Sequence, residues 1–168
     1  MALLLLLLLS ASLGNEAWYS SCAQEAFRLA SLQISFEEDL AWTIELQPAS
    51  SFSDPAILAS TSGIHTVVNA DKDYYYGLDG DCPSDEYDLR TALLHELVHR
   101  LGMSNHIAGD ALMSPVLDEG HACHCIPEDV MDVLTKIGWQ TNNQTLCSSS
   151  SHLALPFMLL SLMLLACI

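Results

Sequence analysis

Two histidines and a glutamate are spaced as in a hydrolytic zinc site, in the run His95-Glu96-Leu97-Val98-His99. Residues four apart lie on the same face of an α-helix, so both imidazoles can bind one metal ion. Glu96 would then take a proton from water that the zinc polarises and pass that proton to the leaving nitrogen. The run therefore predicts a zinc-dependent hydrolase with Glu96 as its general base.

A catalytic zinc ion usually has three protein ligands, so the chain must supply one more after this helix. Gly102 can adopt the left-handed conformation that ends a helix, and the chain can then return toward the metal. We expect His106 to be the third ligand, reached by a local shift of the loop. Asn105, His121 and His124 are the alternatives, and asparagine is the poorest ligand among them.

The segment from His95 to Pro115 resembles the active-site segment of the metzincin zinc endopeptidases, and the matrixin-like group most closely. The family pattern is H-E-x-x-H-x-x-G-x-x-H, followed by a methionine turn that often reads A-L-M-x-P. Gly102 and the run Ala111-Leu112-Met113-Ser114-Pro115 match this pattern. The third histidine position of the family falls on Asn105, one residue before His106.

The resemblance implies hydrolysis of peptide bonds, with Met113 lying beneath the metal without binding it. It extends weakly to residues 71–90 and 127–139, which resemble the strand and loop before the active-site helix and the closing helix of the family. It also implies an α+β fold, with a small twisted sheet, an active-site helix and a C-terminal helix.

The pattern of apolar residues predicts the elements that must position this site. Asp88 is a suitable N-cap for the active-site helix, whose leucines recur every four residues and predict a stripe packed on a sheet. Residues 22–32 have the spacing of an amphipathic helix, and residues 42–46 and 64–68 are typical of strands. Residues 74–76 are expected at the sheet edge. The closing helix should contain Pro127 in its first turn, end at Gly138 and bury Val130, Val133, Leu134 and Ile137.

The two ends of the chain are apolar and are typical of processing signals. Residues 1–14 predict a secretory signal peptide, with cleavage between positions 14 and 17. Residues 148–168 predict a glycosylphosphatidylinositol attachment signal, with a transmembrane anchor as the alternative. The attachment residue is a serine within 148–150, or Asn142 or Asn143. We therefore expect a metallopeptidase domain at 15–147, outside the cell and held at the membrane by a lipid.

The chain is strongly acidic, with 21 acidic and 5 basic residues and a formal net charge of −16. This charge disfavours nucleic acid as a partner. The loop before the active-site helix is rich in aspartate, and Asp79-Gly80-Asp81 offers oxygen ligands for Ca²⁺, although a solvated acidic loop is the more ordinary interpretation. No feature indicates an oligomeric state.

Six cysteines are present, and a secreted chain is expected to pair most of them. We expect Cys123 and Cys125 to form disulfides with cysteines such as Cys22 and Cys82. Cys167 belongs to the removed tail, so Cys147 is left unpaired if the lipid is attached to the serines. Asn143-Gln144-Thr145 is a glycosylation sequon that survives only with that later attachment site.

Two functions fit these residues. The first is an extracellular zinc endopeptidase acting on peptide or protein substrates. The second is a noncatalytic cell-surface binding module on a metzincin-like fold with a degenerate metal site, which Asn105 suggests. Glu96 favours the enzyme, because this carboxylate contributes little to stability and matters mainly for the chemistry.

Overall fold

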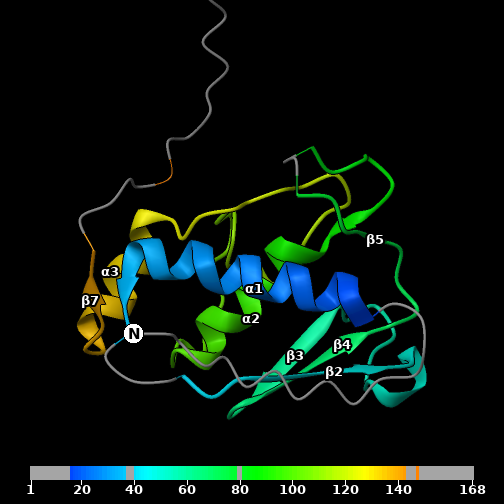
Figure 1. Ribbon diagram of the computed structural model, residues 1–168, viewed down its shortest axis with the longest axis horizontal. Coiled ribbons are helices and arrows are strands. Elements are labelled where there is room, and N and C mark those ends of the chain that lie inside the picture. Colours follow the sequence, from blue (N-terminus) through cyan, green and yellow to red (C-terminus); the bar gives the residue numbers. More distant parts are fainter. Residues whose placement is uncertain (1–15, 37–39, 79–80, 143–146, 148–168) are drawn as a thin grey trace, which may run out of the picture.

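Three α-helices account for most of the regular structure in the described part of the chain (Figure 1). They are α1 (Glu16–Gln33), α2 (Leu89–Arg100) and α3 (Glu128–Lys136). The structure is a computed structural model that describes residues 16–36, 40–78, 81–142 and 147. Together with several small sheets, the helices form a mixed α+β fold, which confirms the predicted fold class.

The main sheet has three strands, in the order β2 (Thr43–Gln47), β4 (His65–Asn69), β3 (Ala59–Ser62). β2 runs parallel to β4, with Ile44 opposite Thr66, whereas β3 is antiparallel to β4 and forms an edge. The predicted strands at 42–46 and 64–68 correspond to β2 and β4. A short 3-10 helix, η1 (Ala49–Ser51), follows β2.

Two further pairs of short strands lie outside the main sheet. β5 (Tyr74–Tyr75) pairs in parallel with β6 (Tyr87–Asp88), and β1 (Ile34–Ser35) pairs antiparallel with β7 (Gln140–Thr141). The expectation that residues 74–76 edge the main sheet was wrong. The Tyr87 N–H donates to the Asp73 carbonyl at 2.9 Å, so this segment pairs with the entry to α2 instead.

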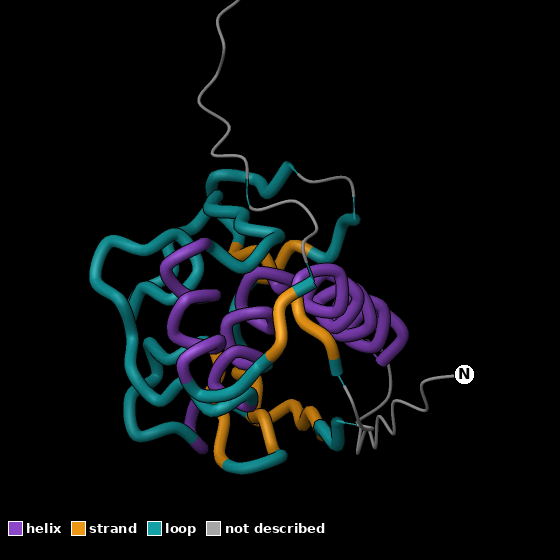
Figure 2. Tube along the Cα trace, turned by 90° about the vertical axis from the view of Figure 1, so that its left-hand side faces the viewer, coloured by secondary structure: helices purple, strands orange, loops and turns teal. Residues whose placement is uncertain are grey.

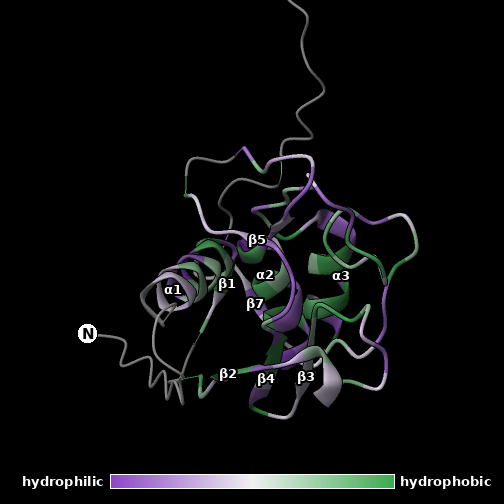
Figure 3. Ribbon diagram, turned by 90° about the vertical axis from the view of Figure 1, so that its right-hand side faces the viewer, coloured by the Kyte–Doolittle hydropathy of each residue, from purple (hydrophilic) through white to green (hydrophobic). Residues whose placement is uncertain are grey.

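The leucine stripe of α2 lies in the core, as predicted. Leu89, Leu93 and Leu97 are fully buried and Leu101 is 4% exposed. α2 packs against both α1 and β3, and Figure 3 shows it between α1 and α3 above the three strands. Burying each leucine contributes about 1.5–3 kcal/mol, so this stripe fixes the rotation of α2 and thereby the direction of its other face.

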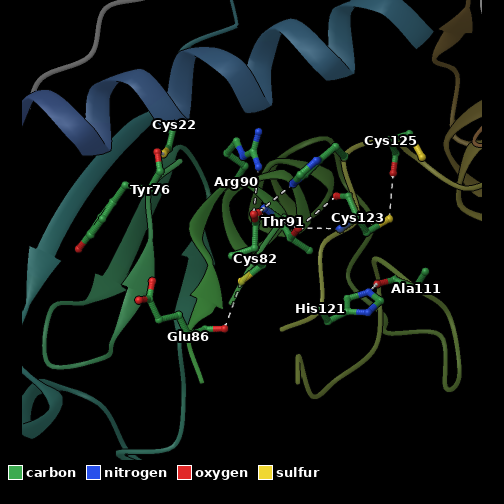
Figure 4. Close-up of polar contacts among 12 residues, drawn as sticks. Cys22, Tyr76, Cys82, Glu86, Arg90, Thr91, Ala111, His121, Cys123 and Cys125 are labelled. Carbon is green, nitrogen blue, oxygen red and sulfur yellow. Dashed lines mark hydrogen bonds and ion pairs between the residues drawn. The ribbon is translucent and has the colours of Figure 1, made fainter. Parts of the chain in front are cut away.

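The N-terminus of α2 is held by a buried polar network (Figure 4). Asp88 is the N-cap, as predicted, and its Oδ1 accepts the Thr91 N–H at 2.7 Å. The other carboxylate oxygen pairs with the Arg90 guanidinium at 3.2 Å, and His124 lies 3.2 Å from Oδ1. Thr91 Oγ1 also accepts the N–H of Cys123 at 2.8 Å. The loop before α3 is thus attached to the start of α2.

The closing helix α3 agrees with its prediction except at its two ends. Pro127 occupies the N-cap position instead of the first turn, and Gly138 follows the helix with a φ of +110°. Val130 and Leu134 are fully buried, but Ile137 is 50% exposed, so its predicted burial was wrong. Ile137 follows the last helical residue, where the chain turns away from the core.

A disulfide joins Cys125 to Cys147, and Cys123 is unpaired, so the prediction that Cys123 and Cys125 pair with cysteines such as Cys22 and Cys82 was wrong. Cys22, Cys82 and Cys123 carry free thiols. The Cys22 thiol donates to the Tyr76 carbonyl and the Cys123 thiol to the Cys125 carbonyl. Figure 4 shows Cys22 and Cys123 on different elements.

Loops form much of the molecule, as the view from the side of α3 and β7 shows (Figure 2). No helix or strand occurs between α2 and α3. None of the described helices combines the length and the apolar character needed to cross a membrane. The predicted signal peptide, the attachment signal with Cys167, the Asn143 sequon residue and Asp79-Gly80 lie outside the described residues.

Candidate metal centre

The imidazoles of three histidines converge beside α2. His95 and His99 lie one turn apart on the helix, and their Nε2 atoms are 3.0 Å apart. The Nε2 of His106 lies 3.3 Å from that of His99. Nitrogen ligands at about 2.0–2.1 Å from a tetrahedral zinc ion are about 3.3 Å from one another, so these separations fit one ion. Among the described residues, this trio is the only group with such geometry.

Hydrogen bonds at the opposite ring nitrogens assign the tautomers of two of these histidines. Nδ1 of His95 lies 2.7 Å from the Leu112 carbonyl, and Nδ1 of His99 lies 2.6 Å from the Met103 carbonyl. A carbonyl only accepts, so each Nδ1 carries the proton and each Nε2 presents a bare lone pair. Two lone pairs facing each other at 3.0 Å repel unless a cation lies between them. The donor set therefore fits a metal ion.

The loop after α2 brings His106 to the helix. Gly102 has a φ of +106°, and its N–H donates to the His99 carbonyl at 3.0 Å, which ends the helix. Ile107 then donates its N–H to the Met113 carbonyl at 2.8 Å. The Asp110 carboxylate accepts the N–H groups of Leu112 and Met113. This closed loop holds His106 against His99 and holds the Leu112 carbonyl against His95.

The alternative third ligands lie elsewhere. Asn105 is exposed and is not among the residues that line the cavity next to the histidines. His121 Nε2 lies 2.7 Å from the Ala111 carbonyl, and His124 Nε2 lies 3.2 Å from the Asp88 carboxylate. The structure thus brings His106 to His95 and His99, and leaves the other three residues outside the trio.

Burial favours the neutral form of His95 and His106, which is the form in which an imidazole binds a metal. It lowers the pKa of His95 to about 4, against a smaller opposing effect of its hydrogen bond to the Leu112 carbonyl. His99 and His106 lower this pKa further. Burial and His99 also lower the pKa of His106.

Glu96 lies on α2 between the two helical histidines and is 5% exposed. Its Oε2 has no hydrogen-bond partner among the described residues, although it is buried. Burial raises the pKa of this carboxyl, while a hydrogen bond with the Thr61 side chain and the charge of His99 oppose the rise. A buried carboxylate oxygen without a partner is available to a ligand in the adjoining cavity.

Thr61 belongs to a chain of hydrogen bonds that crosses the main sheet to Glu96. The Trp42 indole N–H donates to Thr66 Oγ1 at 2.7 Å, and Thr66 Oγ1 lies 2.6 Å from Thr61 Oγ1. Thr61 Oγ1 in turn donates to the main-chain carbonyl oxygen of Glu96 at 3.3 Å. An indole N–H can only donate, so Thr66 Oγ1 accepts from Trp42 and keeps its own proton to donate to Thr61 Oγ1. The Thr61 hydroxyl then donates its proton to the main-chain carbonyl of Glu96.

A cavity of about 800 Å³ adjoins the three histidines and Glu96. Residues 56–61, which end in the edge strand β3, line one side, and Ser114–Leu117 lines another. Ala92 of α2, Tyr87 and Lys72 also line this cavity. It is large enough for a segment of peptide or a small ligand.

Met113 is fully buried, and its main chain belongs to the loop that positions His106. Its predicted place in a turn next to the metal centre is compatible with this position. The predicted Ca²⁺ site at Asp79-Gly80-Asp81 stays a prediction, because Asp79 and Gly80 lie outside the described part of the chain.

The sequence analysis did not identify β3, Thr61 or Lys72. β3 consists of Ala59, Ser60, Thr61 and Ser62, which lack the apolar alternation of a half-buried strand. Gly63, with a φ of +61°, and Ile64 form the two-residue connection to β4. A glycine in such a connection is a hairpin signal, and it could have revealed β3.

No protein-family model matches this chain, and no curated protein matches it either.

Proposed function

We propose that this chain is a zinc endopeptidase of the metzincin type that acts outside the cell. The observation that carries the proposal is the convergence of three imidazole Nε2 atoms in a cavity that Glu96, with its unpartnered carboxylate oxygen, also lines. A purely structural cluster of histidines would satisfy its nitrogens with donors. This one directs them at one another, 3.0 and 3.3 Å apart.

His95, His99 and His106 would hold the metal. Zinc, when bound there, supplies Lewis acidity and lowers the pKa of water. Imidazole nitrogens suit Zn²⁺, and three of them leave a position for water or substrate. The Nδ1 atoms of His95 and His99 donate to the carbonyls of Leu112 and Met103, and these hydrogen bonds hold both rings with Nε2 directed toward the metal position.

Glu96 would move the proton in this reaction. Its buried carboxyl belongs to the lining of the cavity that the three histidines also line, so it can accept a proton from the attacking water. It can then give this proton to the amine nitrogen that leaves. Burial raises its pKa, which brings the carboxyl toward the range in which it can both accept and donate.

A peptide substrate is supported by the walls of the cavity. β3 is an edge strand, so backbone N–H and C=O groups on its outer side can pair with an extended peptide. Ser114–Leu117 faces the same cavity and includes Val116, which is 67% exposed. A strand bound between these walls would pass the three histidines and Glu96.

The site of action is part of the proposal. We propose secretion through the apolar segment at 1–14 and lipid attachment through the segment at 148–168. The Cys125–Cys147 disulfide supports an oxidising compartment. It also favours an attachment residue after Cys147, because earlier attachment at Asn142 or Asn143 would remove one of its two sulfurs.

Metal content and peptide turnover of the purified full chain test the proposal together. We expect one zinc per chain in the wild type, a much weaker site in His106→Ala, and full zinc without turnover in Glu96→Gln. His65→Ala is the matched control, since His65 is exposed and bonds to Thr43 away from the site. A wild type that binds no zinc would refute the metal centre, and turnover by Glu96→Gln would refute its role as base. Zinc binding without turnover would favour the noncatalytic binding module.

A further inference from the structure

The cavity beside the metal centre has further lining residues, Lys72, Tyr87 and Ala92, which we call the Lys72 end. Ala92 precedes His95 by three residues on α2, and an α-helix rises about 1.5 Å per residue, so Ala92 lies roughly 4.5 Å from this histidine along the helix axis. A side chain of a peptide that passes the histidines can therefore extend to this end.

Lys72 is the one lysine or arginine among the residues that line the cavity. Its Nζ lies 5.9 Å from the centre of the Tyr87 ring, which positions the ammonium group over an aromatic face. The lysine is half-buried, and among the described residues it forms no ion pair. In a chain with 21 acidic and 5 basic residues, an ammonium group without a carboxylate at ion-pair distance is unexpected.

The acidic groups near this end have other roles. Asp54 lines the cavity, but it is exposed and its Oδ1 accepts the Ala56 N–H at 2.8 Å. Burial raises the pKa of the Tyr87 hydroxyl, and the carboxylates of Glu119 and Asp118 raise it further. None of the three forms an ion pair with Lys72. The Lys72 ammonium is thus available to an anionic group that enters the cavity.

We propose that Lys72 determines the specificity of this enzyme by binding the carboxylate of an aspartate or glutamate side chain next to the scissile bond. The inference rests on the proposed peptidase function and names its substrate class. The side chain of Ala92 and the apolar residues around it would contact the methylene groups of the acidic residue, and Lys72 would contact its charged end. The net charge of −16 repels acidic peptides at long range, so the preference must arise within the cavity itself.

A peptide series with one varied position tests this directly. Each peptide carries Glu, Gln, Leu or Lys at one of the two positions that flank the scissile bond, and kcat/KM is measured with the zinc-loaded full chain. We expect a roughly five- to tenfold preference for Glu over Gln at one of the two positions, the range for a partly shielded ion pair. Lys72→Met should abolish it, Lys72→Arg should retain it, and Lys72→Glu should favour the Lys peptide instead.

A binding measurement separates this inference from the proposed function. The same labelled peptides are titrated into zinc-loaded Glu96→Gln, with and without Lys72→Met, and fluorescence anisotropy gives Kd. Lys136→Met is the control, since Lys136 is exposed in the last turn of α3 and does not line the cavity. Turnover without a Glu preference would overturn the role of Lys72 and leave the peptidase intact. Preferential binding of the Glu peptide without turnover by the wild type would overturn the peptidase and leave the carboxylate site.

Discussion

Replacing Asp88 tests how the fold positions the metal-binding face of α2. Asp88 is fully buried and caps α2 through the Thr91 N–H, 2.7 Å from Oδ1. Its second oxygen forms an ion pair with the guanidinium of Arg90, which is only 3% exposed. Asp88→Asn retains a capping oxygen and removes the charge, whereas Asp88→Ala removes both. The two variants therefore separate the cap from the ion pair.

The expected magnitudes follow from these contacts. Breaking a buried ion pair by removing one partner costs about 3–5 kcal/mol, because the other charge stays buried and unpaired. Loss of the cap costs about 1 kcal/mol more. We expect Asp88→Asn to lower the free energy of unfolding by about 3 kcal/mol and Asp88→Ala by about 4 kcal/mol, out of a total of about 5–15 kcal/mol for a domain of this kind.

Urea unfolding, followed by the fluorescence of the buried Trp42, measures these values in the presence of chelator. Arg90→Met and the double variant with Asp88→Asn complete a mutant cycle. Since the double variant buries no unpaired charge, it should be destabilised by at least 1 kcal/mol less than the sum of the two single variants. Additive effects of Asp88→Asn and Arg90→Met would show that the two residues are not coupled and would refute the reasoning.

Three further predictions concern the site, the loop and the pH dependence. Thr61→Val should lower kcat about tenfold at unchanged zinc content, since it removes the hydroxyl that donates to the Glu96 main-chain carbonyl and that opposes the rise in the pKa of the Glu96 carboxyl. Thr61→Ser should restore kcat, and equal kcat in all three proteins would contradict this role. Gly102→Val should weaken zinc binding, because a φ of +106° is strained for valine and the His106 loop begins there. Gly63→Val, strained in a remote turn with a φ of +61°, should leave zinc affinity unchanged, and equal losses in both variants would oppose the argument. Burial raises the pKa of Asp88, but hydrogen bonds from His124 and Thr91 outweigh it, so the pKa is below its ordinary value. In the acidic range the unfolded state then binds more protons than the folded state. The contribution of Asp88 to stability should therefore be fully present above the ordinary aspartate pKa of about 3.9 and should be lost as the pH falls through the folded pKa. Measuring the free energy of unfolding against pH should show a smaller loss in Asp88→Asn than in the wild type.

Local sequence was sufficient to predict the helix that carries the metal-binding face. The leucine repeat, the Asp88 cap and Gly102 define α2 within a residue at each end, and all three are local signals. Local patterns typical of strands identified β2 and β4, and apolar positions between Pro127 and Gly138 identified α3. β3 was not predicted from the sequence, because its small residues form a strand through pairing with β4 and not through burial of an apolar face.

The sequence by itself determined that His95 and His99 share one face of a helix that also carries Glu96, because helical periodicity is a property of the local chain. Only the tertiary structure decided that His106, and not Asn105, His121 or His124, meets them. That choice depends on hydrogen bonds between residues distant in sequence, such as the 2.7 Å contact of His95 with the Leu112 carbonyl. The same holds for Thr61 and Lys72, which reach the cavity through sheet pairing and packing. Such contacts depend on how the whole chain closes around its core, and no local pattern encodes them.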